Sequence, residues 1–244
     1  MENILEVRNL KKSFGGIHAV RDVSFDIRKG EVLALVGPNG SGKSTCVNLI
    51  SGMYTLDSGT ITFMGKDITK EKMEKRVELG IGRTFQTPKP FTNLSVYDSV
   101  FTIALKYNKT FDQAAEKTIQ ILEKTDLIKN IDMKSGKLPI EKRKWLDLAR
   151  VLAIEPKLIM FDEVMAGLNP TELEGSLDLI KQINEEGVSV LFIEHVMRAV
   201  MEIADRIIVL DEGQLLAEGL PEEVMSNPAV INAYIGGRTE NAKD

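Results

Sequence analysis

The sequence predicts an α/β fold built on a parallel β-sheet, with antiparallel strands at the N-terminus and a helical insertion in the middle. Three nearly continuous apolar runs, at 32–36, 158–161 and 188–193, are typical of strands that helices cover on both faces. Segments with helical periodicity at 43–50 and 171–186 are linked to two of these runs. Strands and helices alternating at this spacing indicate βαβ units, and therefore a parallel sheet.

The first thirty residues have a different pattern, in which apolar and polar positions alternate. Breaks at Gly15-Gly16 and Lys29-Gly30 divide this region, and a further strand-like run follows at 60–64. Period-two alternation between glycine-rich breaks predicts antiparallel strands. Near the other end, apolar runs at 207–210 and 215–217 flank a turn and predict a hairpin, which a short helix near 221–226 follows.

The middle of the chain, about 88–155, contains no convincing strand. Ser95 with Asp98 three residues later resembles a capping box before a helix. Helical faces recur near 115–122 and 145–152, before Pro156. We therefore expect one unit over residues 1–244, with an α/β core at about 1–87 and 156–244 and a helical insertion at about 88–155.

Composition limits the class of protein. The chain has 244 residues, of which 43% are hydrophobic and 27% charged, and a formal net charge of −5, which argues against nucleic-acid binding. A single cysteine, Cys46, excludes an internal disulfide, fits a reducing compartment and receives no functional role. The apolar runs are too short to span a bilayer, and the N-terminus lacks the apolar core of a signal peptide. These observations predict a soluble, intracellular, globular protein.

The strongest motif is a G-x-x-x-x-G-K-[ST] loop that follows the apolar run at 32–36 and precedes the helical segment. With the next residue it comprises Gly37, Pro38, Asn39, Gly40, Ser41, Gly42, Lys43, Ser44 and Thr45. The glycines let backbone N–H groups and the positive helix end face phosphate oxygens. Lys43 would contact the β- and γ-phosphates, and the hydroxyl of Ser44 would ligate Mg²⁺. The loop predicts a nucleotide phosphate site, against the alternative of a glycine-rich turn without a ligand.

Two other apolar runs also end in polar residues. Asp162-Glu163 follows the run at 158–161, and the run at 188–193 leads into Glu194-His195. The carboxyl ends of parallel strands meet at the edge where open α/β sheets bind ligands. We expect Asp162 to hold Mg²⁺ through its water shell, Glu163 to act as general base on the attacking water, and His195 to contact the γ-phosphate. An exposed strand end and a structural histidine are the simpler alternatives.

These residues together resemble the nucleotide-binding subunit of an ABC transporter, over essentially the whole chain. The resemblance implies that Phe14 stacks on adenine and that 37–45 is the Walker A loop. It makes Asp162-Glu163 the Walker B motif with its catalytic glutamate and His195 the switch histidine. It also implies that Gln86 is the Q-loop glutamine. In that role Gln86 would be both a catalytic residue and a ligand of Mg²⁺. The implied cofactors are ATP and Mg²⁺, and the implied activity is an ATPase in which two subunits close on ATP and open after hydrolysis.

Finer features resemble the branched-chain amino acid importers. They are Phe14-Gly-Gly-Ile-His-Ala-Val20, Gly82-Arg-Thr-Phe-Gln86, Ala166-Gly-Leu-Asn-Pro-Thr-Glu172 and Ala233-Tyr-Ile-Gly-Gly237. The resemblance implies two membrane permease subunits, contacted through the insertion near Gln86 and 88–105, and an extracytoplasmic substrate-binding protein that acts indirectly. It also implies a cytoplasmic, peripheral location on the inner face of the cell membrane.

One motif departs from the family pattern. The signature loop, usually Leu-Ser-Gly-Gly-Gln, falls on Leu138-Pro139-Ile140-Glu141-Lys142, which we interpret as a degenerate signature motif. Pro139 lacks the serine hydroxyl and the N–H, and Glu141 brings negative charge where a positive helix end is wanted. Milder departures are Val164, where the family usually has proline, and Asn169 in place of an aspartate. We therefore favour a heterodimer with a second ABC ATPase subunit over a homodimer.

Three functions remain open at this point. The first is the ATPase of an importer for branched-chain or related amino acids. The second is a non-transport ABC ATPase, although such proteins usually carry tandem cassettes, coiled coils or basic arms. The third is a regulatory nucleotide-binding subunit that does not hydrolyse, which the signature loop favours and Glu163 and His195 oppose.

Overall fold

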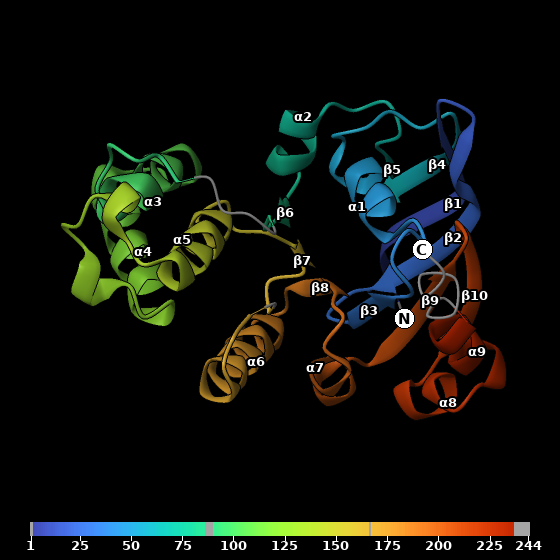
Figure 1. The fold of residues 1–244 in the computed structure, drawn as a ribbon. Helices are drawn as coiled ribbons and strands as arrows, with labels where there is room; N and C mark the ends of the chain where they lie inside the picture. Colours follow the sequence, from blue (N-terminus) through green and yellow to red (C-terminus); the bar gives the residue numbers. More distant parts are fainter. Residues whose placement is uncertain (1, 86–89, 166, 237–244) are drawn as a thin grey trace.

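Two β-sheets form the centre of the structure, a computed structural model that describes residues 2–85, 90–165 and 167–236 (Figure 1). The smaller sheet is antiparallel, with the order β2 (Ile17–Arg28), β1 (Asn3–Phe14), β4 (Ser58–Phe63), β5 (Lys66–Asp67). The larger sheet has the order β10 (Gln214–Gly219), β9 (Arg206–Asp211), β3 (Val32–Val36), β8 (Ser189–Ile193), β7 (Leu158–Asp162), β6 (Ile81–Arg83). Its neighbours are parallel except β9 and β10. The predicted parallel sheet and antiparallel N-terminal part are confirmed.

Both faces of the larger sheet are buried, as the continuous apolar runs predict. On β3, Leu33 and Leu35 belong to the core beneath the antiparallel sheet and α1 (Lys43–Ser51). Val32, Ala34 and Val36 belong to the core on the opposite face, with α6 (Pro170–Glu185) and α7 (Met197–Ile203). Because successive side chains of a strand point to opposite faces, a strand covered on both faces is apolar at nearly every position.

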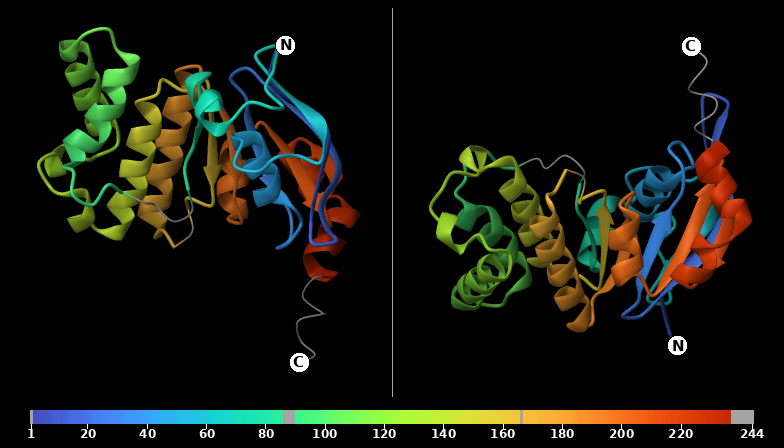
Figure 2. Two further views of the ribbon diagram at one scale, coloured as in Figure 1. Left: turned by 90° about the horizontal axis from the view of Figure 1, so that it is seen from above. Right: turned by 60° about the horizontal axis from the view of Figure 1, so that its bottom comes forward.

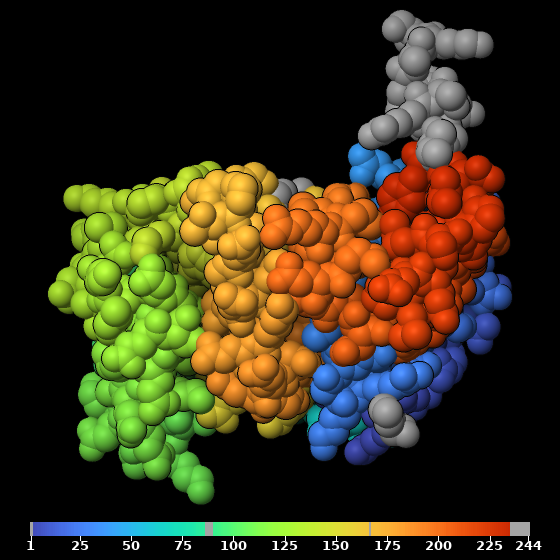
Figure 3. All heavy atoms as spheres, turned by 90° about the horizontal axis from the view of Figure 1, so that it is seen from below, coloured from blue at the N-terminus to red at the C-terminus, as the bar shows by residue number. Residues whose placement is uncertain are grey.

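The helical insertion consists of α3 (Val96–Tyr107), α4 (Phe111–Lys124) and α5 (Ile140–Leu152), with short 3₁₀ turns at Ile128–Asn130 and Ser135–Lys137. The Ser95 hydroxyl accepts a hydrogen bond from the Asp98 N–H at 2.9 Å and caps α3, in agreement with the sequence pattern. The three helices form one end of an elongated molecule, and the C-terminal helices α8 (Pro221–Met225) and α9 (Pro228–Gly236) lie toward the other (Figures 2 and 3).

Several short elements do not follow from the sequence pattern. They are β5, β6, α2 (Met73–Glu78), α7 and α9. The predicted hairpin of β9 and β10 is present, but β9 also pairs in parallel with β3 and so extends the main sheet. Over the part of the chain that the structure describes, no helix combines the length and the apolar character needed to cross a bilayer.

Candidate functional site

Three neighbouring strands bring the predicted polar residues to one edge of the larger sheet. The strands β3, β8 and β7 lie side by side and parallel, with Ile193 of β8 paired to Leu35 on one side and to Asp162 on the other. The phosphate loop, Glu163 and His195 therefore leave the sheet at the same carboxyl edge. This is the edge where open α/β sheets bind ligands, as the sequence predicts.

The phosphate loop needs glycine at its two ends. Gly37 has a φ of +146°, and a Cβ there would lie 2.0 Å from the Leu210 carbonyl oxygen. Gly42 has a φ of +103°, and a Cβ there would lie 2.5 Å from the Ala19 carbonyl oxygen. Gly42 is also the N-cap of α1 and provides no side-chain hydrogen bond to the helix. The first N–H groups of α1 consequently remain as donors for an anion.

Lys43 is folded against the loop that contains it. Its Nζ donates to the carbonyl oxygens of Gly37 and Pro38 at 2.8 and 2.9 Å and lies 3.5 Å from Ser41 Oγ. Burial lowers the pKa of Lys43, whereas the nearby charges of Glu163 and Asp162 oppose that shift. A phosphate group would stabilise the ammonium in the same way as these carboxylates.

The loop and two of the predicted catalytic residues surround one hollow of about 180 Å³. Its lining consists of Ala19, Asn39, Gly40, Ser41, Gly42, Lys43, Ser44, Thr45, Glu163 and His195. Gly37 and Pro38 are not part of this lining, but their carbonyl groups accept the hydrogen bonds from Lys43. The structure thus brings together the loop, Glu163 and His195, which are far apart in the sequence.

Glu163 and His195 are in direct contact. His195 Nε2 donates to Glu163 Oε1 at 2.7 Å, and both side chains are partly accessible. Glu163 adopts a left-handed backbone conformation with a φ of +52°, and its N–H donates to the Ile193 carbonyl at 2.9 Å. Such a conformation is unusual for a residue other than glycine and persists only where surrounding contacts hold it. The contact places a carboxylate base beside a group that can donate a proton.

Glu194 supports the segment after Glu163 and is a site residue that the sequence reasoning missed. Its side chain is 1% exposed, and its Oε1 accepts a hydrogen bond from the Met165 N–H at 2.7 Å. Burial raises the pKa of Glu194 to about 7, against the opposing effect of N–H groups of Met165 and His195. The only sequence signal was a carboxylate directly after a buried strand.

Asp162 forms an ion pair that the sequence reasoning also missed. Arg83 Nη2 donates to Asp162 Oδ2 at 2.7 Å, and each side chain is 10% exposed. Carboxylate and hydroxyl oxygens suit Mg²⁺ as ligands, so the chemistry of Asp162 and of Ser44, which lines the 180 Å³ hollow, fits this ion. The glycine-containing loop in the same lining fits a phosphate chain. No cluster of three or more His, Cys, Asp or Glu residues forms a separate metal site within the described residues.

The family resemblance also singles out Phe14 and Gln86, and the structure describes only the first of them. Phe14 is 42% exposed at the end of β1, with its ring 5.3 Å from that of Tyr54 and an interplanar angle of 70°. It is not among the residues that line the 180 Å³ hollow. Gln86 lies outside the described residues. Tyr54, which the sequence did not single out, is therefore a second aromatic surface beside Phe14.

The segment aligned with the signature loop forms the start of α5. Leu138 is buried, Pro139 is the N-cap without a side-chain hydrogen bond, and Ile140 is 65% exposed. Glu141 is exposed in the first turn. Asn169 caps α6 through a reciprocal pair of hydrogen bonds with Glu172, which accounts for an amide at this position.

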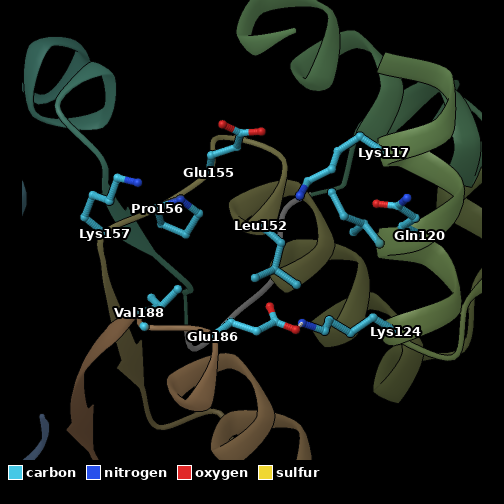
Figure 4. A pocket seen from close by; sticks show the side chains of 11 residues that line it. Lys117, Gln120, Lys124, Leu152, Glu155, Pro156, Lys157, Glu186 and Val188 are labelled. Carbon is cyan, nitrogen blue, oxygen red and sulfur yellow. Dashed lines mark hydrogen bonds and ion pairs between the residues drawn. The ribbon is translucent and has the colours of Figure 1, made fainter. Parts of the chain in front are cut away.

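A larger hollow of about 410 Å³ lies between the helical insertion and the core (Figure 4). Its lining includes Lys117 and Lys124 of α4 and the segments 155–157 and 186–188. Those segments lead into β7 and β8, so this hollow is at the amino edge of the sheet, opposite the phosphate loop. An ion pair between Lys124 and Glu186 joins the insertion to the core there. The 410 Å³ hollow is therefore distinct from the nucleotide site.

Comparisons with known proteins identify the family. The family model described as ABC transporter matches residues 20–166, and the model described as Branched-chain amino acid ATP-binding cassette transporter matches residues 214–240. A probable branched-chain amino acid transport ATP-binding protein, LivG, of Archaeoglobus fulgidus is 34% identical over 247 residues, which cover 96% of each chain. LivG of Salmonella typhimurium, a high-affinity branched-chain amino acid transport ATP-binding protein, is 34% identical and covers 96% of this chain and 98% of its own.

Solved structures agree with this family. The crystal structure of the ADP conformation of an ATP-binding cassette of an ABC transporter superposes with a TM-score of 0.86 at 34% identity. The superposition covers 97% of this chain and 100% of the other. The observed fold, with its antiparallel β part, parallel sheet and helical insertion, is that of an ABC ATPase cassette.

Proposed function

The chain belongs to the ABC transporter ATPase family, and from that premise we propose that it couples ATP hydrolysis to uptake of branched-chain or related amino acids. The observation that carries the proposal is the 180 Å³ hollow, where the phosphate loop meets Glu163 and His195. The relatives named for branched-chain amino acid transport support the substrate class. The non-transport and regulatory alternatives are not favoured.

The chain's own residues define the chemistry of hydrolysis. The loop N–H groups and Lys43 would bind the phosphate chain, and Ser44 and Asp162 would hold Mg²⁺. Bound Mg²⁺ supplies charge neutralisation and orientation of the phosphates. Glu163 would take a proton from the attacking water. The oxygen of that water forms a bond to the γ-phosphorus while the bond from the γ-phosphorus to the bridging oxygen of ADP breaks.

His195 sets the orientation of the base before nucleotide arrives. Its Nε2–H donates to Glu163 Oε1 at 2.7 Å, which restricts the rotation of the carboxylate that would accept the proton of the water. A γ-phosphate in the hollow offers His195 another acceptor, and contact with it would stabilise negative charge during hydrolysis. We propose Gln86 as a further contact to the metal and Phe14 as the stacking surface for adenine.

The proposed assembly has separate membrane subunits. The chain would act as a peripheral subunit on the cytoplasmic face of the membrane and contact two permease subunits through the insertion near 88–105. An extracytoplasmic substrate-binding protein would deliver the amino acid. The insertion forms one end of the molecule, away from the C-terminal helices, which supports this role (Figure 3).

The nucleotide partner is proposed to be a second ABC ATPase subunit. In the family, ATP lies between the Walker A loop of one subunit and the signature loop of the other. Here Ile140 and Glu141 are exposed at the start of α5, where a phosphate would require small residues and positive potential. A heterodimer would pair the intact phosphate loop of this chain with an intact signature loop of its partner.

Turnover of the purified chain tests the nucleotide partner. Mg²⁺-dependent ATPase activity should stay near zero over a wide protein concentration range, while ATP binding is retained. Activity that rises faster than linearly with concentration would show a working homodimer and contradict the heterodimer. Lys43→Ala serves as the control without a nucleotide site. In the assembled complex we expect one ATP turned over per closure cycle, and hydrolysis at both sites would contradict the proposal.

Uptake by whole cells tests the substrate class. Replacing the native copy by the Glu163→Gln variant should abolish ATP-dependent uptake of labelled leucine, isoleucine or valine. Uptake of labelled lysine should be unchanged, which controls for a general loss of membrane energisation. Normal uptake of all three branched-chain amino acids, in cells shown to contain the variant complex, would contradict the assignment.

A further inference from the structure

Arg83 connects the phosphate-loop helix to the carboxylate of the metal site. It is the last residue of β6, the edge strand next to β7. Its Nη2 donates to Asp162 Oδ2 at 2.7 Å, and its Nη1 donates to Asn48 Oδ1 at 2.6 Å and to Ser51 Oγ at 3.2 Å. Because Asn48 and Ser51 belong to α1, one guanidinium fixes Asp162 relative to the phosphate loop.

The ion pair is sheltered from solvent. The side chains of Arg83 and Asp162 are each 10% exposed, so water screens their interaction far less than that of a surface pair. Arginine retains its charge throughout the working pH range, unlike histidine. Arg83 therefore neutralises Asp162 for as long as the contact persists.

This neutralisation affects a cation that arrives without nucleotide. Such a cation would meet Asp162 already paired with Arg83, and the ammonium of Lys43 lies close enough to interact with the charges of Asp162 and Glu163. The positive charges of Arg83 and Lys43 thus offset the negative charges of the Asp162 and Glu163 carboxylates. The phosphates of a nucleotide would add several negative charges and several oxygen ligands at the same place. The net charge of the site would then be negative, and a cation would be attracted to it.

We propose that Arg83 makes cation binding at Asp162 depend on nucleotide, so that Mg²⁺ enters with the phosphate chain and not before it. This inference rests on the proposed nucleotide site. The ion pair is made through Oδ2 of Asp162. Oδ1 is the oxygen that could approach the water shell of the metal while Arg83 stays in place.

Direct cation binding tests the role of Arg83. Mn²⁺ is used as the probe for the full chain, and free Mn²⁺ is measured by electron paramagnetic resonance without nucleotide and with a non-hydrolysable ATP analogue. The unchanged chain should bind Mn²⁺ tightly only with the analogue. Arg83→Gln and Arg83→Met should bind Mn²⁺ without nucleotide about tenfold or more tightly than the unchanged chain, because one nearby positive charge is gone. Arg83→Lys should behave like the unchanged chain.

Arg76→Gln is the matched control. Arg76 is also buried and holds the same end of α1 as Arg83, since its Nη1 donates to the Leu49 and Ile50 carbonyls at 2.7 and 2.8 Å. Its hydrogen bonds within the described residues go to carbonyl oxygens, and none goes to Asp162. Its loss should lower stability without changing Mn²⁺ binding. A shift of the same size in Arg76→Gln would mean that loosening of α1, and not the charge of Arg83, controls the metal, and would overturn the proposal.

Two further results would overturn the inference. One is tight Mn²⁺ binding by the unchanged chain without nucleotide, a measurement that needs no variant. The other is unchanged Mn²⁺ affinity in a folded Arg83→Gln or Arg83→Met variant. Failure of the proposed function looks different, because the unchanged chain would then bind neither the ATP analogue nor Mn²⁺ in its presence.

Discussion

Replacing Glu194 by glutamine should change how the stability of the protein depends on pH. Glu194 is 1% exposed, and its carboxylate accepts a hydrogen bond from the Met165 N–H at 2.7 Å. Met165 follows two residues after Glu163, whose backbone is left-handed. Burial raises the pKa of Glu194 from 4.5 to about 7, and the charge of Glu163 adds to this effect. Glutamine has nearly the same shape and can accept the same hydrogen bond, but it has no proton to lose at these pH values.

The size of the effect follows from the raised pKa. At ~1.4 kcal/mol per pH unit, the interval from 4.5 to about 7 corresponds to about 3 kcal/mol. The folded chain keeps a proton on Glu194 that the unfolded chain releases above pH 4.5. The free energy of unfolding therefore loses this contribution as the pH rises to about 7, and the loss is complete above it. Glu194→Gln should avoid this loss.

Denaturant unfolding at several pH values measures the difference. The free energy of unfolding of Glu194→Gln minus that of the unchanged chain should increase by about 3 kcal/mol between about pH 4.5 and about pH 8. All other titrating groups cancel in this difference. Glu185→Gln, at an exposed position near the end of α6, controls for loss of a glutamate charge in general. A difference for Glu194→Gln that stays constant with pH would refute the reasoning.

Three other substitutions test separate parts of the site. Lys43→Ala should abolish binding of a fluorescent ATP analogue, because it removes the ammonium inside the phosphate loop; unchanged affinity would exclude the loop as the site. In the complex with its partner subunit, Glu163→Gln should retain ATP binding and trap the ATP-bound dimer, with phosphate release reduced at least ~10²-fold, and normal turnover would remove Glu163 from the mechanism. Asn169→Ala should lower the free energy of unfolding by about 1 kcal/mol in denaturant titrations through loss of the α6 cap; equal stability would show that Glu172 N–H finds another acceptor.

Features that depend on local pattern could be predicted from the sequence. The run at 32–36 is apolar throughout because helix and sheet cover its two faces, and that pattern is visible in the residues alone. The glycines at 37 and 42 are required by left-handed backbone and by carbonyl groups within 2.5 Å of a Cβ. The sequence likewise predicts the strand ends that lead into Asp162 and His195, because the runs at 158–161 and 188–193 are nearly continuous in apolar residues.

Features that depend on pairing between distant segments could not be predicted in this way. Arg83 meets Asp162 only because β6 pairs with β7, and β6 has three residues, too few to show a periodic pattern. Glu194 meets the N–H of Met165, which lies 29 residues earlier in the chain. Tyr54 approaches Phe14 only after the chain has turned at the end of α1. In each case the side chain looks ordinary until its neighbours are known.

The buried core of α5 does not constrain the residues in its first turn. The helix is held by Leu146, Leu148 and Leu152 on its buried face, whereas Ile140 is 65% exposed and Glu141 is exposed. Burial of those leucines stabilises α5 whatever stands in its first turn. The constraint on residues 139–141 must then come from outside the chain's own core. A phosphate facing this turn would select glycine and exclude Glu141. In the proposed heterodimer, this chain would therefore contribute its phosphate loop to the signature loop of the partner, and its own first turn of α5 would face no hydrolysed phosphate.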